Sequence, residues 1–528
     1  MWMFRRIDTF YSNNFIFEKS GAMGDRCYDI CYGCFAKTQN KISMKTKKLL
    51  LSLLCLISTS VPAQQLTLDN AIEIAQENSL DAQSARFSFL AAYWTFRSFK
   101  AELLPAVNLS GGLMNYNRSL VETRNYEDGR LAYVSNNTLN NSLTLSIDQE
   151  IAATGGRVSL MSYLHRLDQF SYDERTYNSQ PIRVSYTQPL RTYNTLKWKK
   201  KTAPVEYEIA QKEYAASLQE IAVRVTSLFF SVLSAQSDLK QTQATLTDRK
   251  TLYEMAQKRL ELGTTPKSEV LQMELSLLNA KVAVQKNRIT LEDDMYNLFS
   301  YLRVTDYNGA ELIPPYLVPD MCIDADELLE KAMANSAHTK ELKLQMLNAE
   351  QNLAQAKANR GLQMTLNGEL GFMQTGKTIG GGYRNPKDYE VIGLTLRLPI
   401  FDWGVNKGRV RMAQAQMEVI RTQQEQAHQD YVQDLRKRVM QFNAYPAQCR
   451  DALRAREIAE ERYGIMKQRY EAGTVSVTDL NTAWQEMTSA NGQYISQLRA
   501  FWNDYYSLQK ATLYDWVKKK PITVADEP

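Results

Sequence analysis

The sequence predicts an α+β membrane protein in which long coiled-coil helices alternate with β-strands. Three observations support this fold class. The chain repeats one large unit, each copy contains very long helical stretches, and each copy contains segments in which apolar and polar residues alternate. At 528 residues, the chain is also longer than one ordinary globular core requires.

Two constant offsets reveal the repeat. "QKRLELGTTPKSEVLQ" matches "KQRYEAGTVSVTDLNT" 210 residues later, and "AIEIAQENS" matches "LLEKAMANS" 257 residues later. Because the offsets differ by 47, the first copy carries about 47 extra residues, which lie between Gly112 and Pro189. We therefore expect a first repeat over 64–310, a proline-rich linker over 311–323, a second repeat over 324–515 and a C-terminal tail over 516–528.

Each copy is expected to contain one very long helix, over 200–262 and over about 407–472, with a kink at Pro446 in the second. At 1.5 Å per residue such a helix spans roughly 90 Å. The helix that follows in the first copy has two neighbouring apolar stripes. One stripe is Leu271, Leu275, Leu278, Val282, Ile289, Tyr296 and Phe299, and the other is Val270, Leu277, Val284, Leu291 and Leu298. Heptad spacing predicts a helix seam, and two stripes predict a helix that packs on two sides.

A Gly-Thr pair followed by β-branched residues interrupts the helical pattern in both copies, at Gly263-Thr264 and at Gly473-Thr474. Gly costs about 1 kcal/mol relative to Ala inside a helix, and β-branched residues add smaller costs. We therefore expect these positions to be turns between two helices, with Thr474–Thr478 carrying the chain around in the second copy.

Segments between the helices alternate with period two. Apolar sets occur at Leu143, Leu145 and Ile147, at Ile182 and Val184, at Leu366, Leu370 and Phe372, and at Ile392, Leu394, Leu396 and Leu398. Such strands are typical either of a half-buried soluble sheet or of an outer-membrane barrel. We expect hairpin regions over 105–190 and 362–400, with "TGKTIGGGYRNP" (375–386) as a flexible polar loop. Residues 113–188 are long for one hairpin, so they hold either an additional strand pair or a long extracellular loop.

The beginning of the chain predicts export. Residues 44–63 combine lysines, a short apolar run and the small-residue end "VPA", as in a secretory signal peptide. Because such a signal normally begins a chain, we interpret residues 1–43 as a mis-called extension. After residue 63 no run of about 18 apolar residues occurs, so a membrane role would rest on β-strands. Cys55 does not fit a lipobox, and Cys27, Cys31 and Cys34 are a weak metal motif.

Charge and motifs exclude several function classes. Of the 63 basic and 58 acidic residues, nine basic and four acidic ones lie in 1–63, so the remaining chain is neutral and is not expected to bind nucleic acid. His165, His338 and His428 are scattered, and no nucleotide loop or nucleophile arrangement occurs. We expect neither an enzyme nor a cofactor. Cys322 and Cys449 alone do not predict a disulfide framework.

The ordered motifs resemble the family of TolC-type outer-membrane efflux proteins. "LTLDNAIEIAQENS" resembles the family's opening helix, "AELLPAVNLSGG" its helix-to-strand passage, "LRLPIFDWGVNKGRV" its strand-to-helix passage and "RYEAGTVSVTDL" its periplasmic tip turn. The resemblance implies a homotrimer in which long helices form a periplasmic α-barrel continuous with an outer-membrane β-barrel. It implies at least four strands per chain, and four from each of three chains give one twelve-stranded barrel.

The implied function is that of the outer-membrane channel of a tripartite efflux or type I secretion system. Such a channel passively conducts substrate outward from a periplasmic adaptor and an inner-membrane pump of RND or ABC type. The implied partners are a second and third copy of the chain, the adaptor, the pump and outer-membrane lipid. The alternative is an exported coiled-coil scaffold or adhesin without a pore, which would not need period-two segments at the same place in both halves.

The resemblance also assigns site residues. Asp479 matches a position where an aspartate ring narrows the pore, Tyr470 matches a tip tyrosine that helps to hold the closed state, and Glu269 is the first-copy equivalent of Asp479. The next ring position is Thr482, and the position of the family's tip arginine is Val475. A three-fold carboxylate ring would favour cations and raise its own pKa. The alternative is that Glu269 and Asp479 only cap the helices that follow.

Two further sets complete the candidate site. The tip turns, which are expected to contact the adaptor, are Gly263, Thr264, Gly473 and Thr474. The residues expected to line the barrel lumen are Asp148, Arg183, Glu369 and Arg397, for which simple solvation of a polar face is the alternative.

Overall fold

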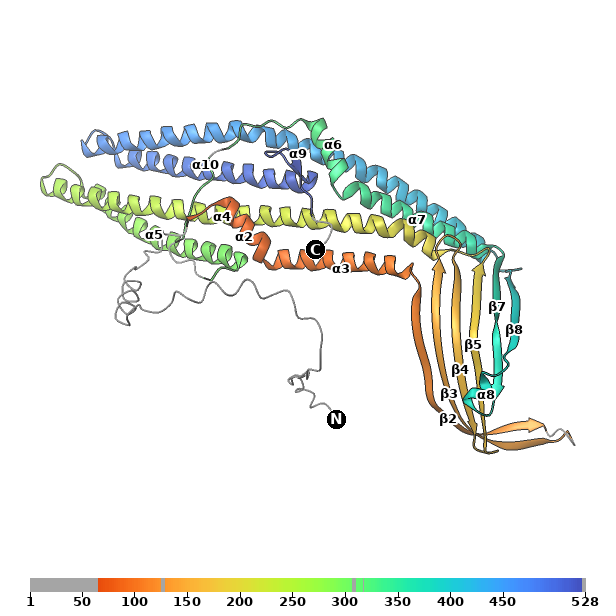
Figure 1. Ribbon diagram of the computed structural model, residues 1–528. Helices are drawn as coiled ribbons and strands as arrows, with labels where there is room; N and C mark the ends of the chain where they lie inside the picture. The colour runs from red at the N-terminus through yellow and green to blue at the C-terminus, as the bar shows by residue number, and fades with distance from the viewer. Residues whose placement is uncertain (1–64, 125–128, 306–309, 317, 525–528) are drawn as a thin grey trace, which may run out of the picture. The chain divides into compact units, whose positions relative to one another are not determined.

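The computed structural model describes residues 65–124, 129–305, 310–316 and 318–524 (Figure 1). The expected extension (1–43), the expected signal peptide (44–63) and Cys27, Cys31, Cys34 and Cys55 lie outside the described residues.

The helices of the two halves follow the same order and have equal lengths. The first half has α2 (Leu68–Asn78), α3 (Leu80–Glu102), α4 (Thr195–Glu261) and α5 (Lys267–Leu302). The second half has α6 (Ala325–Asn335), α7 (His338–Arg360), α9 (Val405–Glu471) and α10 (Val477–Thr512). These pairs are 11, 23, 67 and 36 residues long. The long helices expected from the sequence are therefore present, and α9 continues through Pro446, which is buried within it.

Short-range capping explains where the shorter helices begin. The Ser79 hydroxyl accepts a hydrogen bond from the Ala82 N–H at 3.1 Å, and this residue separates α2 from α3. In the second half the Asp324 carboxylate accepts from the backbone N–H groups of Asp326 and Glu327 at the start of α6. Ser and Asp are favoured at this position because their oxygens satisfy N–H groups that have no partner within the helix.

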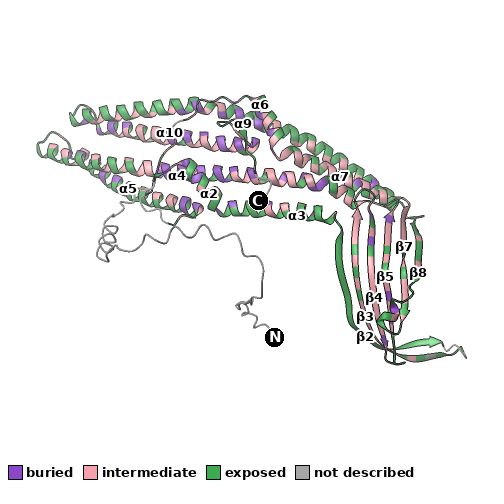
Figure 2. Cartoon of the chain, in the orientation of Figure 1, coloured by how far each residue is buried: buried purple, intermediate pink, exposed green. Residues whose placement is uncertain are grey.

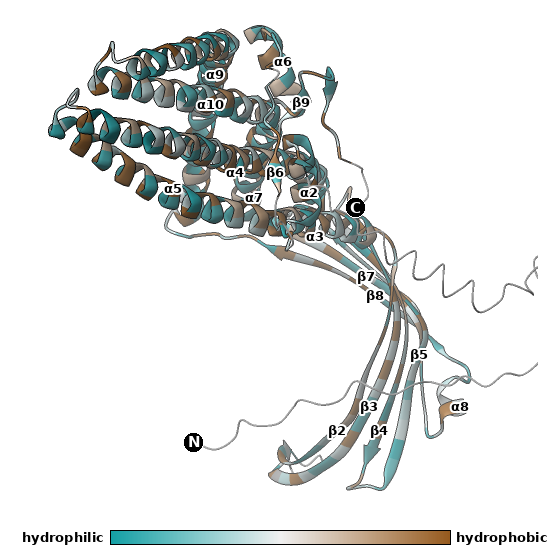
Figure 3. Ribbon diagram, turned by 90° about the vertical axis from the view of Figure 1, so that its left-hand side faces the viewer, coloured by the Kyte–Doolittle hydropathy of each residue, from teal (hydrophilic) through white to brown (hydrophobic). Residues whose placement is uncertain are grey.

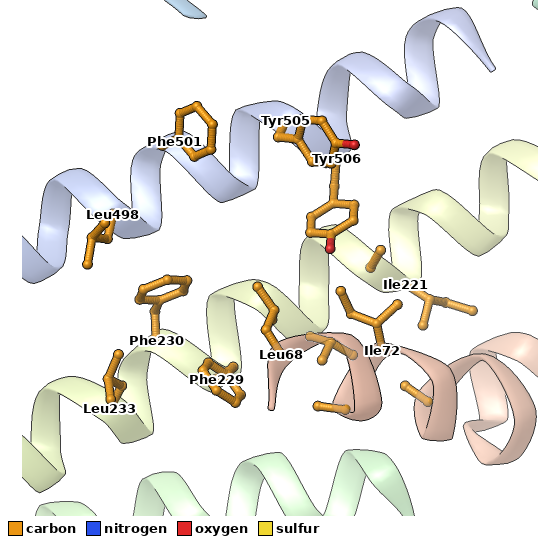
Figure 4. Close-up of a cluster of buried hydrophobic side chains, with 14 of the residues drawn as sticks. Leu68, Ile72, Ile221, Phe229, Phe230, Leu233, Leu498, Phe501, Tyr505 and Tyr506 are labelled. Carbon is orange, nitrogen blue, oxygen red and sulfur yellow. The ribbon is translucent and has the colours of Figure 1, made fainter. Parts of the chain in front are cut away.

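The main hydrophobic core joins α2, α4, α5, α6, α9 and α10, and Figure 4 shows part of it. Side chains buried there and labelled in the figure are Leu68, Ile72, Ile221, Phe229, Phe230, Leu233, Leu498, Phe501, Tyr505 and Tyr506. Figure 2 shows most of the buried residues on the helices, whereas the strands are mainly exposed or half-buried. By length and composition alone, α4 is apolar enough to cross a membrane. Half of its most apolar window is nevertheless buried inside the protein, as expected of a core helix.

Within the described residues, six strands form one antiparallel sheet in the order β2-β3-β4-β5-β7-β8. They are β2 (Ala106–Arg124), β3 (Leu131–Ile151), β4 (Gly156–Gln169), β5 (Glu174–Pro189), β7 (Gln363–Gly376) and β8 (Lys387–Arg397). Residues 113–188 thus hold an additional strand pair and not one long loop. The strand count therefore exceeds the minimum of four that the resemblance implies, because the 47 extra residues fold as sheet.

The loop over 375–386 is not the flexible loop that was expected. It contains a helical turn, α8 (Ile379–Gly382), and Gly382 is buried. The Ser179 hydroxyl on β5 donates a hydrogen bond to the carbonyl of Gly382. A Cβ atom on Gly376 would lie 2.5 Å from the carbonyl carbon of Gly381. Glycines therefore allow this loop to fold closely against the sheet.

The two halves of the chain are interleaved. Strand β5 of the first half pairs with β7 of the second half, and α4 contacts α10. Short strands connect the first half to the linker, since β1 (Gln65–Leu66) pairs in parallel with β6 (Glu311–Leu312). At the end of the chain, β9 (Tyr514–Asp515) pairs with β10 (Lys520–Pro521). The expected ranges 64–310 and 324–515 therefore share their sheet and their core.

Candidate functional site

Both Gly-Thr pairs lie at helix ends with the same geometry. Gly263 and Gly473 have φ angles of +72° and +76°, the left-handed region that glycine adopts without steric cost. The N–H of Thr264 donates to the carbonyl of Arg259 at 2.9 Å, and that of Thr474 donates to Arg469 at 3.0 Å. Together with the bond from each glycine N–H, these contacts form a Schellman motif, which satisfies the last carbonyls of α4 and α9. The structure therefore has a turn between two helices at both positions where the sequence predicted one.

The residues after the two turns differ. Ser476 precedes α10, and its hydroxyl accepts from the Asp479 N–H at 3.2 Å while the Asp479 carboxylate accepts from the Ser476 N–H at 3.2 Å. This reciprocal pair is a capping box. Helix α10 therefore begins at Val477, so the second turn is shorter than the expected 474–478. Pro266 precedes α5 in the first copy and offers no side-chain cap, which leaves Glu269 free for other contacts.

Glu269 and Tyr470 are brought together across the two halves. The Tyr470 hydroxyl donates to Glu269 Oε1 at 3.2 Å, although the residues are 201 positions apart. The ring of Tyr470 is 2% exposed and lies in a cluster of apolar side chains that joins all four tip helices. Members of this tip cluster are Leu252, Ala256, Val270, Met273, Tyr470, Val477 and Leu480. Burial and the Glu269 carboxylate together raise the pKa of Tyr470 to about 12, so its hydroxyl remains a donor.

Arg259 joins the two tips and was not singled out by sequence reasoning. Its guanidinium donates to the carbonyl of Glu471 at 2.7 Å, which lies at the end of α9. The same group lies over the ring of Tyr470, at 5.9 Å from the centroid. Arg259 is also the residue that aligns with Arg469 at the 210-residue offset, so the repeat contained a signal for its position.

Asp479 lies in an open hollow of about 600 Å³ at the second tip. The residues that line this hollow are Arg462, Met466, Arg469, Gly473, Thr474, Val475, Ser476, Asp479 and Thr482. The two hydrogen bonds from Ser476 and the charge of Arg469 hold the pKa of Asp479 below its usual value. The alternative that Asp479 caps a helix is therefore observed within the single chain. The side chain of Val475 packs against the tip cluster.

The four candidate lumen residues lie on one face of the sheet. The register places Asp148 opposite Ser159, Ser159 opposite Ser185, and Ser185 opposite Glu369, so these side chains share a face. Arg183 lies an even number of positions from Ser185 on β5, and Arg397 lies an even number of positions from Val391, which pairs with Glu369, on β8. Because side chains alternate between the two faces of a sheet, both arginines lie on this face as well. Arg183 forms an ion pair with Glu369 at 3.2 Å, and the Tyr389 hydroxyl donates to the same carboxylate at 3.1 Å. Tyr389 was missed as a member of this polar set.

The opposite face of the sheet is apolar and exposed. Directly opposed residues across five strands are Val107, Ile147, Leu160, Val184 and Leu370. Each is between 39% and 68% exposed, which is unusual for aliphatic side chains aligned in one row. The alternation along the strands is visible in Figure 3 as brown and teal segments. The prediction of strands with one apolar and one polar face is confirmed.

Other reactive groups are dispersed among the described residues. The three histidines do not share one site: His165 contacts Asn140 on the sheet. The ring of His338 stacks on Tyr431 with centroids 4.1 Å apart, and the charge of His428 reaches His338. Cys322 is exposed and Cys449 is buried, and both thiols are free. In the part of the chain that the structure describes, no group of three or more His, Cys, Asp or Glu side chains could hold a metal ion.

Comparison with known proteins identifies relatives of this chain. Residues 71–302 and 328–512 match the family described as "Outer membrane efflux protein". Outer membrane protein TolC of Escherichia coli (strain K12) is 22% identical over 349 residues, which cover 61% of this chain and 69% of that protein. The TolC protein of Vibrio cholerae is 21% identical over 298 residues, covering 55% of this chain and 67% of that protein.

Solved structures of outer-membrane channels share the fold. The Campylobacter jejuni CmeC outer membrane channel has a TM-score of 0.60 at 15% identity, and the match covers 84% of this chain and 85% of that one. The outer-membrane channel OprN has a TM-score of 0.61 at 13% identity, with coverage of 84% and 89%.

Proposed function

Because this chain belongs to the outer membrane efflux protein family and is located in the outer membrane, we propose that it acts as a homotrimeric duct. In this proposal the duct passively conducts substrate from a periplasmic adaptor and an inner-membrane pump of RND or ABC type to the exterior. The proposed architecture is a periplasmic α-barrel that continues into an outer-membrane β-barrel. Each chain would contribute two duplicated repeats, over 64–310 and 324–515.

The observation that carries this proposal is a sheet that is apolar on one exposed face and open at both edges. Strands β2 and β8 are the edges, and each pairs on one side only within the described residues. Unpaired backbone groups cannot face lipid, because each would remain without a hydrogen-bond partner. Pairing β2 of one chain with β8 of the next would close the sheet. The apolar row would then face lipid, and Asp148, Arg183, Glu369 and Arg397 would face the lumen.

The helices support the same assembly. On α5 the second apolar stripe is packed within the chain, and Val270, Leu277 and Leu298 are buried. Phe299, the last member of the first stripe, is buried in the main core. The other members of that stripe are more than half exposed among the described residues: Leu271, Leu275, Leu278, Val282, Ile289 and Tyr296. Heptad-spaced apolar residues of this kind fit a helix of a neighbouring copy. A solitary adhesin or scaffold would leave this stripe and the sheet edges exposed.

The periplasmic tips would hold the duct closed. The bond from Tyr470 to Glu269 and the bond from Arg259 to Glu471 tie the two tips of one chain together. Opening the duct requires the tips to separate, so these contacts must be lost or exchanged. The position of the family's tip arginine is occupied by Val475 in this chain. Arg259 would supply a positive charge close to the tip in its place. The exposed turns Gly263-Thr264 and Gly473-Thr474 would meet the adaptor.

Single-channel conductance of the purified full-length protein in planar lipid bilayers tests the proposal. We expect a cation-preferring pore with low conductance in the wild-type protein. A protein that inserts into lipid as a trimer and conducts no ions would contradict the channel assignment. Adaptor binding is tested by co-purification with a periplasmic adaptor from the same organism.

Two matched variants distinguish a pore-narrowing role of Asp479 from a helix-capping role. Asp479→Asn removes the charge and keeps an acceptor for the Ser476 N–H, whereas Ser476→Ala removes the cap hydroxyl and keeps the charge. If Asp479 forms a selective ring, cation preference falls in Asp479→Asn and persists in Ser476→Ala. Unchanged selectivity in Asp479→Asn would leave only the capping role.

A further inference from the structure

The sheet contains two strands that have no counterpart in the second half. The offset of 257 aligns β2 with β7. The offset of 210 aligns Pro189, at the end of β5, with Pro399, just after β8. Strands β3 and β4 are therefore the product of the 47 extra residues. A chain that contributed only strands with counterparts would supply four, whereas this one supplies six within its described residues.

The extra strands are continuous with the rest of the sheet. Strand β3 pairs with β4 without interruption from Thr138–Gln169 to Ile151–Gly156. The turn that joins them, residues 152–155, is fixed to the start of α4, because Asn194 Nδ2 donates to the carbonyl of Ala152 at 3.1 Å. Gln188 Nε2 donates to the carbonyl of Thr154, also at 3.1 Å. Gly155 supplies the positive φ angle, +74°, that this turn needs.

The extra strands also share the two faces of the sheet. Ile147 on β3 and Leu160 on β4 lie in the apolar row between Val107 and Val184. Their polar neighbours Asp148 and Ser159 lie opposite each other on the other face. A hairpin folded into the lumen as a plug would not continue the apolar face. This pattern is that of wall strands with one side in lipid.

We infer that the outer-membrane barrel of this protein has eighteen strands and is about as wide as the helical duct that leads to it. The inference rests on the proposed trimer, with six strands from each chain. A wall strand occupies about 6 Å of circumference, given a spacing of about 4.8 Å and a tilt of about 40°. Six strands therefore span about 37 Å per chain, and four would span about 25 Å.

The helices beside the sheet give an independent measure of width. Four helices lie side by side in the order α3, α4, α7 and α9, and each contacts the next. Four helices at about 10 Å spacing span about 40 Å. Six strands match this width, and four fall short by more than a third. The additional hairpin thus removes the mismatch between the two parts of the wall.

The consequence concerns cargo size. Eighteen strands close into a barrel with a backbone diameter of about 35 Å, compared with about 24 Å for twelve. Barrels of 16–18 strands leave an aqueous channel. In this protein the barrel would impose no narrowing after the helical duct, so the periplasmic tips alone would set the size limit. The exit would admit cargo as bulky as a polypeptide segment, as well as small solutes.

Strand counting by cryo-electron microscopy of the full-length protein in lipid nanodiscs tests the inference. We expect three-fold symmetry and eighteen wall strands, with β2 of one chain beside β8 of the next. A trimer with twelve wall strands, or with β3 and β4 folded into the lumen, overturns the inference and leaves the proposed channel intact. A protein that forms no trimer overturns the proposed function and this inference with it.

Thiol labelling provides a second test on adjacent residues of β4. Leu160→Cys lies on the apolar face and Met161→Cys on the face of Arg183, its direct partner. In proteoliposomes, on a Cys322→Ser, Cys449→Ser background, a water-soluble maleimide should label Met161→Cys at least tenfold faster than Leu160→Cys. Equal labelling at both positions would contradict a place for β4 in the wall.

Discussion

Tyr470 takes part both in an apolar cluster and in a polar contact between the two tips. Its ring fills the apolar cluster that joins the tips, and its hydroxyl contacts Glu269. We predict that Tyr470→Phe keeps the packing and loses the hydrogen bond, which costs about 1.5 kcal/mol because the acceptor is charged. Conductance should rise, because the closed tip loses that stabilisation relative to the open one. The control in bilayer recordings is Tyr253→Phe, which packs against the same cluster and removes a hydroxyl whose partner among the described residues, Gln257, lies on its own helix α4.

His338 makes stability depend on pH. It is the first residue of α7, it stacks on Tyr431, and both burial and the charge of His428 lower its pKa. The unfolded state then binds the proton more readily than the folded state, so stability falls as the pH drops below about 6.5. We expect thermal unfolding at pH 5 to occur at a lower temperature than at pH 7. His338→Phe should reduce this difference, and an unchanged difference would assign it to other groups.

At the scale of the element, the tip turns depend on glycine for a backbone reason. Gly263 and Gly473 have positive φ angles. A Cβ atom at either position would cause no steric clash, since the nearest atom would lie 3.7 Å away at Gly473 and none lies within 4 Å at Gly263. Gly263→Ala and Gly473→Ala should each destabilise the protein by about 1 kcal/mol, the cost of the left-handed conformation. Gly464 lies inside α9 in open space, so Gly464→Ala should instead stabilise by up to about 1 kcal/mol. Chemical denaturation of the three variants checks the opposite signs.

The sequence predicted elements better than it predicted side-chain partners. The long helices and the turns were predictable because heptads and Gly-Thr breaks are local signals, and because the repeat shows each signal twice. The capping box was also present in the sequence as Ser476 three residues before Asp479. The contact between Tyr470 and Glu269 was not predictable, since it depends on how two tips 201 residues apart pack together. Whether residues 113–188 form an additional strand pair was not predictable, because an alternating segment can belong either to the barrel wall or to a long loop.

At the scale of the whole molecule, assembly should depend on the exposed stripe of α5. Leu278→Lys places a charge within that stripe, where the side chain is 51% exposed in the single chain. We predict that the chain keeps its helical content and loses the trimer, because the cost arises only when a neighbour covers the charge. Gln272→Lys, about 100° around the helix from Leu271, is the control. Native mass spectrometry in detergent distinguishes trimer from monomer, and an intact Leu278→Lys trimer would exclude this stripe from the interface.

The interleaving of the two halves also sets an order of events during folding. Strand β5 has no second neighbour until β7 has been exported. Pro189 of β5 pairs with Thr365 of β7, and these two residues are separated by 176 positions along the chain. Contacts at such separation form slowly, because a long loop must close first. Meanwhile β2 to β5 can pair locally and present an apolar face to water. The added hairpin enlarges that face, so a nascent chain of this protein should depend more on periplasmic chaperones than one with fewer strands would.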